Sequence, residues 1–328
     1  MKLLYIKQGI KIRYNTNEYI DETIFALDSD NNIIQNTTFY TNIYPINQDD
    51  LNDIISQIYK TNNIVNVPKG FLFYSFAYQK SFVHYLTNNV PKLCDYINSY
   101  KDYKLLIPKH FYNNLCKDIL ELCNISISNV ELLEDNTIYN IIDCVQIKHY
   151  EAPPSNFTEN HLWIYRKIRE KLNIYENSTP YKKIYLKRDN ISNIDYGNDE
   201  TGILRQIINE KDLIDKLIEN GFEIITLGNK SITEKCDLLN NCLIIVTPLG
   251  ANCMNLIFSN SPKHMIIVSN DRNFGHDYYT NISCKLNNSN INYKTFRYNS
   301  IGTDPLNYWN SSFSVNVDEI IENVNLML

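Results

Sequence analysis

Apolar strand-like runs and amphipathic helices alternate regularly between residues 183 and 258. Three short β-prone runs, residues 183–186, 222–226 and 243–246, are separated by helical patterns. The last run is entirely apolar, which is typical of a strand buried on both faces of a parallel sheet. The order βαβαβα predicts a doubly wound α/β sheet in this part of the chain.

The helices between these runs carry local start and stop signals. A helix is predicted from Asn209 and Glu210, because its apolar residues fall on one face of a 3.6-residue period. Gly221 then stands where a C-terminal glycine belongs. Ser231 and Glu234 form a capping-box pattern, so a second helix is predicted at 232–240. A third helix is predicted to begin at residues 253–258, after the turn Thr247–Asn252.

The first half of the chain also alternates between strands and helices. Strand-like runs at 3–6 and 23–27 precede a predicted amphipathic helix at 48–61. The later predicted elements are an aromatic strand or loop at 70–76, helices at 81–100 and 111–123, and strands at 104–107, 130–133 and 138–147.

Two lobes are predicted, with a Pro-containing linker at 151–155 between them. A long helix at 157–172 follows the linker, and further elements are expected at 265–268 (strand), 277–285 (helix) and 292–297 (strand). We assign residues 1–152 to a first Rossmann-like lobe and residues 153–310 to a second. Residues 311–328, with an amphipathic helix at 318–328, are expected to pack back on the first lobe.

In doubly wound sheets, ligands bind at the carboxyl ends of the strands, where helix N-termini direct free N–H groups outward. Arg188 follows one predicted strand, and Gly250, Ala251 and Asn252 form a turn into a helix after another. Either feature alone has a simpler explanation, since Arg188 could be a solvated charge and Gly250 only a turn residue. Together, on one edge of a sheet, they favour a site for a phosphate-bearing ligand.

Composition narrows the class of protein. The 328 residues carry a net charge of −6, which argues against sequence-independent nucleic-acid binding. No apolar run approaches the roughly 20 residues of a membrane span, and Lys7 interrupts the short apolar N-terminus. The eight cysteines contain no C-x-x-C pair, as expected for buried thiols in a reducing compartment. We expect a cytoplasmic protein without a zinc site.

One triplet has the form of a metal-binding motif. Asp28, Ser29 and Asp30 form a D-x-D, which many metal-dependent glycosyltransferases use to hold a divalent cation. Asn31 and Asn32 follow it, and the five residues together have the composition of a hairpin turn. We therefore interpret the triplet as a turn and expect no metal cofactor.

Several motifs in series resemble glycosyltransferase family 61. Residues 81–93 contain His84, two hydrophobic residues and then Pro91-Lys92-Leu93, similar to the motif of that family's first domain. The family's later motifs are an arginine after a strand, R-x-x-x-N-E, a Gly-Phe strand and an H-G-A-x-x-x-N turn. Their counterparts in this sequence are Arg188, Arg205 with Asn209 and Glu210, Gly221 with Phe222, and Gly250 and Ala251 with Asn255. The order and spacing fit from about residue 70 to 300.

The resemblance implies a GT-B fold, with two Rossmann-like lobes and a cleft between them. It also implies an inverting transfer of a sugar from a UDP-sugar, xylose or GlcNAc, to a glycan or protein hydroxyl without a bound metal. The UDP-sugar is then a substrate and not a cofactor. Without a cation, the leaving diphosphate must be stabilised by basic side chains and helix N-terminal amides. The positions predicted to bind the donor are Arg188, Arg205, Asn209, Glu210, Leu227, Gly228, Ser231, Thr247, Gly250, Ala251, Asn252 and Asn255.

Two positions depart from the family pattern. Leu249 replaces the histidine before Gly-Ala, and Asn88 replaces the acidic residue that commonly follows four positions after His84. Because an amide cannot accept the acceptor's proton, His84 is predicted to be the general base. The departures also keep open a catalytically weak or inactive GT-B module that binds a glycan or protein partner. A nucleotide-dependent sugar epimerase is disfavoured, because the chain lacks G-x-G-x-x-G after its first strand.

Overall fold

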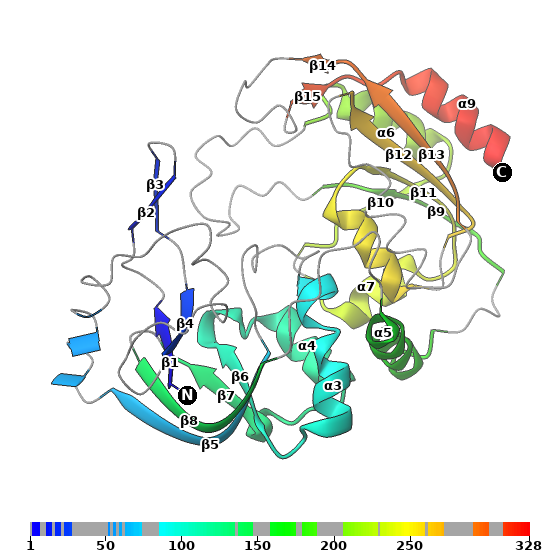
Figure 1. The fold of residues 1–328 in the computed structure, drawn as a ribbon. Helices are drawn as coiled ribbons and strands as arrows, with labels where there is room; N and C mark the ends of the chain where they lie inside the picture. Colours follow the sequence, from blue (N-terminus) through cyan, green and yellow to red (C-terminus); the bar gives the residue numbers. More distant parts are fainter. Residues whose placement is uncertain are drawn as a thin grey trace. The chain divides into compact units, whose positions relative to one another are not determined.

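The chain forms two compact units, Met1–Ala152 and Pro153–Leu328, in a computed structural model (Figure 1). The residues that the structure describes are 2–6, 11–14, 17–20, 23–27, 52, 55–56, 59–60, 63–73, 85–134, 137–146, 158–174, 179–188, 206–228, 230–259, 262–271, 291–301 and 311–328. The sequence analysis placed its boundary between the same two residues, 152 and 153, while the donor and acceptor roles of the lobes stay predictions.

The second unit contains a five-stranded parallel sheet in the order β10-β9-β11-β12-β13. Its strands are β9 (Lys182–Leu186), β10 (Glu223–Ile225), β11 (Cys242–Pro248), β12 (His264–Asn270) and β13 (Asn292–Tyr298). The chain runs outward from β9 to β10 and then returns to β11 on the other side of β9. The gap between the carboxyl ends of β9 and β11 is therefore the topological switch point, where doubly wound sheets bind ligands. The prediction of a doubly wound sheet is confirmed for this unit.

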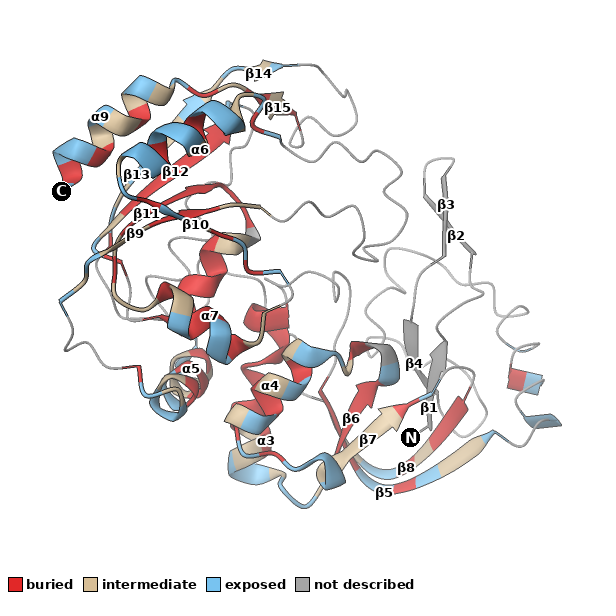
Figure 2. Ribbon diagram, turned by 180° about the vertical axis from the view of Figure 1, so that it is seen from behind, coloured by how far each residue is buried: buried red, intermediate tan, exposed pale blue. Residues whose placement is uncertain are grey.

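Helices cover both faces of this sheet. Figure 1 shows α6 (Glu210–Glu219) and α9 (Val317–Met327) on one face and α7 (Ile232–Leu239) with α5 (Glu159–Lys171) on the other. The 3₁₀ helix η4 (Ala251–Phe258) lies on the α7 side. Alternate residues of each strand belong to the two apolar cores on opposite faces of the sheet, so β11 and β12 are buried along almost their whole length (Figure 2). The guanidinium of Arg169 on α5 donates to the carbonyl of Ser259 at 2.6 Å and so ties α5 to the end of η4.

The local signals for α6 and α7 are confirmed. At the end of α6, Gly221 has a φ of 79°. Its N–H donates to Ile218 at 2.9 Å, and that of Phe222 donates to Leu217 at 3.0 Å, which is a Schellman cap. At the start of α7, Ser231 and Glu234 exchange the hydrogen bonds of a capping box. The end of α6 and the start of α7 are therefore set by local backbone chemistry.

The C-terminal helix packs within the second unit. Ile320, Val324 and Met327 of α9 are buried in the same core as Leu213 and Leu217 of α6. The hydroxyl of Tyr298 on β13 also donates to Glu319 at 3.0 Å. We had expected this helix to return to the first lobe. Its apolar stripe instead covers the sheet beside α6, because that face of β12 and β13 would otherwise expose apolar side chains.

The first unit contains a six-stranded mixed sheet in the order β4-β1-β8-β5-β6-β7. Its strands are β1 (Lys2–Ile6), β4 (Thr23–Leu27), β5 (Ile64–Leu72), β6 (Lys104–Pro108), β7 (Val130–Leu133) and β8 (Thr137–Gln146). Strands β8, β5, β6 and β7 are parallel, whereas β1 and β4 extend the sheet in antiparallel fashion. The α/β class is confirmed here, but the sheet is not the purely parallel one of the Rossmann-like lobe that we expected. Antiparallel edge strands on a parallel sheet are common in α/β folds.

The helices of the first unit differ in one place from the prediction. Within the predicted helix at 81–100, residues Tyr85–Asn89 form a π-helical turn and α3 begins only at Lys92 (Lys92–Ser99), after Pro91. Proline tolerates the first turn of a helix but breaks its interior, because it lacks an N–H group. The helix α4 (Asn114–Leu122) lies inside its predicted range. The described residues within 48–61, namely 52, 55–56 and 59–60, are helical as predicted.

The remaining described elements are short. They are β2 (Lys11–Tyr14) paired with β3 (Asn17–Ile20), β14 (Ser300–Ile301) paired with β15 (Ser312–Phe313), and the 3₁₀ turns η2 (Lys109–Phe111) and η3 (Ile127–Asn129). The predicted linker at 151–155, the predicted helix at 277–285 and the D-x-D of Asp28–Asp30 lie outside the described residues. Within the described part, no helix is both long enough and apolar enough to cross a membrane.

Candidate functional site

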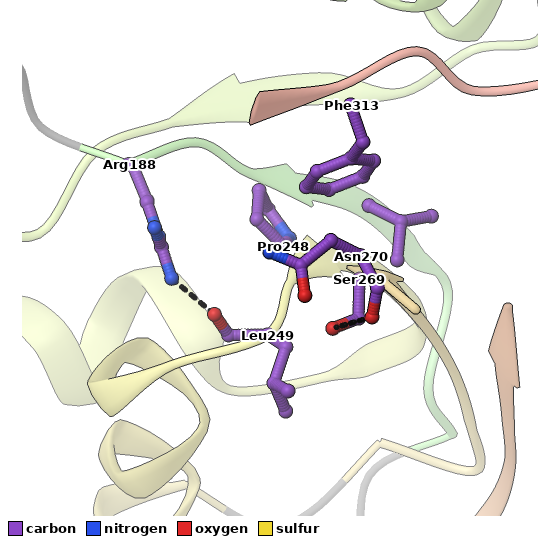
Figure 3. Close-up of a pocket in the computed structure, with 7 residues that line it drawn as sticks. Arg188, Pro248, Leu249, Ser269, Asn270 and Phe313 are labelled. Carbon is purple, nitrogen blue, oxygen red and sulfur yellow. Dashed lines mark hydrogen bonds between the residues drawn. The ribbon is translucent and has the colours of Figure 1, made fainter. Parts of the chain in front are cut away.

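The candidate site lies at the switch point of the second unit, between the ends of β9 and β11. Arg188 follows β9, Pro248 ends β11, and Leu249 comes directly after it. In Figure 3 the side chain of Arg188 extends from its strand end toward the backbone of Leu249, to whose carbonyl its Nη2 donates a hydrogen bond. The two features that the sequence placed on one edge of a sheet, the arginine and the glycine turn, are thus neighbours.

Three hydrogen bonds join the two strand ends. The hydroxyl of Thr247 donates to the carbonyl of Leu186 at 3.1 Å, and the amide of Asn252 donates to the carbonyl of Lys187 at 3.4 Å. The bond from Arg188 to Leu249 is the third. Thr247 is completely buried, so its side chain fixes the spacing of the strand ends. Thr247 and Asn252, predicted as donor-binding residues, therefore shape the edge on which a ligand would rest.

Gly250 permits the close approach of Arg188. A Cβ atom at position 250 would lie only 2.6 Å from Nη2 of Arg188, well inside van der Waals contact. Any side chain here would displace the guanidinium from the turn. The glycine is thus required by the position of the arginine, in addition to its role in the turn.

The turn leads directly into η4, whose first backbone amides lie at this edge. The bond from Cys253 N–H to the Gly250 carbonyl, at 3.1 Å, closes its first turn. Asn255 donates from its side-chain amide to the carbonyl of Asn252 at 3.1 Å. Its amide oxygen is buried and accepts no hydrogen bond within the described part of the structure. A helix start with an adjacent cation suits an anion, because both present N–H groups and positive potential.

A shallow depression beside Arg188 contains residues that the sequence analysis missed. It is lined by Arg188, Pro248, Leu249, Val268, Ser269, Asn270 and Phe313 (Figure 3). Asn270 donates to the carbonyl of Ser311 at 2.9 Å, which holds the segment before Phe313 at the end of β12. The position of Asn270 after a buried strand could have identified it. No local signal could have identified Phe313, because its place depends on a bridge to Ile207.

Glu210, predicted to contact the donor, is bonded within the protein. One carboxylate oxygen accepts from the hydroxyl of Tyr185 at 2.8 Å, and the other lies 3.6 Å from the ammonium of Lys187. Burial and the adjacent carboxylate both raise the pKa of Tyr185, so its hydroxyl remains a donor. The preceding residue, Asn209, uses both ends of its amide on the backbone of Val315, each at 2.9 Å. Asn209 therefore fixes the chain after β15.

Three other predicted positions have mainly structural surroundings. Leu227 is buried in the apolar core on the α7 side of the sheet. Gly228 is exposed in the turn that follows β10. The hydroxyl of Ser231 is engaged with Glu234 in the capping box. These residues lie after a strand end, as the sequence pattern indicated, but their contacts do not by themselves suggest a ligand. Two predicted site residues, His84 and Arg205, lie outside the described residues.

A buried polar turn stands at the start of α3 in the first unit. Thr87, Asn88 and Asn89 of the π-helical turn are all buried, and Thr87 donates to the amide oxygen of Asn88 at 3.0 Å. Lys92 is fully buried, and its ammonium lies 3.4 Å from the carbonyl of Phe73, which follows β5. π-Helical turns occur frequently at functional sites. This one directly follows His84, the predicted base.

Lys92 should make stability depend on pH. Burial lowers the pKa of its ammonium from the ordinary 10.5 to about 7. Between the two pKa values, about 7 and 10.5, the unfolded chain binds up to one more proton at Lys92 than the folded chain. The free energy of unfolding therefore rises with pH, by up to about 1.4 kcal/mol per pH unit. Below the folded pKa both states are protonated, and the full cost of the buried charge remains.

The measurement is urea unfolding of the wild type and Lys92→Met at several values between pH 7 and 10. We expect the unfolding free energy of the wild type to rise with pH relative to that of the variant. Lys101→Met, which removes an exposed lysine of the same unit, should follow the wild type. Parallel curves for the wild type and Lys92→Met would show that Lys92 is charged throughout.

Comparison with known proteins assigns these features to a family. The family model described as Glycosyltransferase 61 matches residues 82–267, more than half of the chain. The match begins just before the buried polar turn and ends within β12, so it includes both strand ends of the candidate site. No curated protein matches the chain.

Proposed function

The chain belongs to glycosyltransferase family 61, and we propose that it transfers a sugar from a UDP-sugar to a hydroxyl group of a glycan or protein. Glycosyl transfer is the activity that the family supports. UDP-xylose and UDP-GlcNAc are the donors we propose, with a GT-B arrangement in which the second unit binds the donor and the first takes the acceptor. The observation that carries this proposal is Arg188 fixed across the switch point, beside the Gly250 turn.

The leaving diphosphate is the group that this edge stabilises best. When the bond between the anomeric carbon and the diphosphate oxygen breaks, the electron pair remains on UDP. Charge that develops there is stabilised by donors already in position. A guanidinium is a planar group whose geometry suits phosphate oxygens, and the bond to Leu249 fixes the orientation of the Arg188 guanidinium at this edge. The amides at the start of η4 add a helix N-terminus, so this transfer is proposed to need no metal ion.

Inversion requires a base on the acceptor side, and we propose His84 for this role. The base removes the proton of the acceptor hydroxyl while its oxygen attacks the anomeric carbon from the face opposite UDP. Asn88 cannot replace it, because an amide accepts no proton at neutral pH, and its oxygen already accepts from Thr87. Arg205 is proposed as a second basic residue at the diphosphate.

A weakly active or inactive module that binds a glycan or protein is the second candidate. Two observations favour it. Leu249, at the family's histidine position, has its side chain in the apolar core, and Asn88 is buried in the π-helical turn. Neither leucine nor asparagine can take up and release a proton, as the histidine and the acidic residue that they replace can.

Hydrolysis of nucleotide sugars without an acceptor distinguishes the two candidates. The purified chain is incubated with a panel of UDP-sugars in the presence of EDTA, and released UDP is measured. We expect slow release from UDP-xylose or UDP-GlcNAc that EDTA does not reduce. A requirement for divalent cations would contradict the metal-independent mechanism, and UDP binding without any turnover would favour the inactive module.

A further inference from the structure

Lys187 and Glu210 form a half-buried ion pair at the carboxyl end of β9. Their side chains are 31% and 25% exposed, and the Nζ–Oε2 distance is 3.6 Å. This distance lies beyond the range of a hydrogen bond between an ammonium and a carboxylate. The other oxygen of Glu210 accepts the Tyr185 hydroxyl at 2.8 Å. The carboxylate is thus fixed by the tyrosine, whereas within the described residues the ammonium of Lys187 makes no hydrogen bond and is held by charge.

The backbone of Lys187 lies at the centre of the candidate site. Its carbonyl accepts the Asn252 amide at 3.4 Å, and its neighbours Leu186 and Arg188 make the other two bonds that join the strand ends. Lys187 and Arg188 directly follow β9, so two cations lie at the same strand end. Arg188 is bonded to a backbone carbonyl, and Lys187 is paired with a carboxylate.

We propose that Lys187 is a further cation for the diphosphate of the donor, beside Arg188, and that Glu210 holds it at the strand end until a phosphate oxygen replaces the carboxylate. This inference rests on the proposed function, since it names a further binding residue for the same site. A loose, partly exposed ion pair contributes little to stability, so it separates at small cost. After the exchange, the carboxylate of Glu210 still accepts the hydrogen bond from the Tyr185 hydroxyl. It also stays in the first turn of α6, where the N-terminal amides stabilise its negative charge.

The exchange predicts opposite effects for the two partners. Lys187→Met removes the cation but keeps most of the side-chain length, and should weaken UDP binding about tenfold, typical of a lost charge-assisted hydrogen bond. Glu210→Gln still accepts from Tyr185 but no longer competes for Lys187, and should tighten UDP binding by roughly threefold. If Glu210 instead contacted the ribose, its replacement would weaken binding of both UDP and uridine.

The experiment is calorimetric titration of the wild type and the two variants with UDP, inorganic pyrophosphate and uridine. Lys183→Met is the matched control. Lys183 lies near the start of β9, the strand that Lys187 follows, and its ammonium is near the Asn220 carbonyl. We expect the control to bind like the wild type, and any affinity for uridine to be the same in all proteins. Melting temperatures show whether each variant is folded.

The outcomes distinguish this inference from the proposed function. UDP binding that is unchanged in Lys187→Met, or weakened in Glu210→Gln, overturns the inference and leaves the proposed function intact. Binding of pyrophosphate but not of UDP, with the predicted response of both variants, supports the inference and contradicts the nucleotide part of the function. Absence of binding of either ligand to the wild type contradicts both.

Discussion

Replacing Arg188 with alanine is expected to lower the rate of glycosyl transfer by roughly 10²–10³-fold, the usual effect of removing one preorganised donor to a developing oxyanion. The guanidinium is positioned before any ligand binds, because it donates to the Leu249 carbonyl and passes over Gly250. Its contribution therefore requires no rearrangement when charge develops on the leaving diphosphate. UDP binding should weaken as well, since the same group is proposed to contact the diphosphate before the reaction.

Two variants test whether the rate depends on the exact position of the Arg188 guanidinium and whether the effect is specific to this arginine. Gly250→Ala keeps Arg188 but introduces a Cβ that would lie 2.6 Å from Nη2, so it should reproduce much of the rate loss. Arg297→Ala removes an exposed arginine from β13 of the same unit and should leave turnover unchanged. The measurement is UDP release under saturating donor. Wild-type rates in Arg188→Ala would remove the arginine from the mechanism.

His84→Ala is expected to reduce turnover by roughly 10²–10⁴-fold while leaving UDP binding nearly unchanged. General base catalysis has this magnitude, and histidine is the side chain whose ordinary pKa, about 6.5, suits it near neutrality. UDP binding should persist, because its proposed contacts lie in the second unit. Turnover and UDP affinity measured on the same preparation report the two quantities separately.

The control for His84→Ala must distinguish chemistry from packing. A histidine that only packs would lower the melting temperature and leave the rate per folded molecule unchanged. His264→Ala, at the start of β12, removes a histidine from the second unit and should not change turnover. A folded His84→Ala protein with full activity would contradict the assignment of the base.

Most elements of the second unit could be predicted from sequence, because their signals are local. The apolar run 243–246 lies within β11, and Gly221 and the Ser231–Glu234 pair mark helix ends by backbone chemistry alone. The first unit was harder. β5 begins at Ile64 and passes through Asn66, Pro68 and Lys69, which do not resemble a buried strand. It is identified by pairing with β6 and β8, which are distant in sequence.

The sequence predicted the location of the candidate site better than the contacts that its side chains make. The sequence brought Arg188 and Gly250 to one edge, since both follow strands of one parallel sheet. It could not show that Asn209 is bonded to Val315, or that Glu210 is bonded to Tyr185, because these partners are fixed by tertiary packing. The place of α9 was missed for the same reason, since an apolar stripe does not identify the surface that it covers.

The central claim is that the donor nucleotide binds at the switch point between β9 and β11. Hydrogen exchange of the chain with and without UDP tests it most directly, because bound phosphate protects the backbone amides that it contacts and the loops that it orders. The account predicts slower exchange in peptides covering residues 182–188 and 247–258 when UDP is present. Unchanged exchange in both segments, with protection confined to β5 and β6 of the first unit, would contradict it.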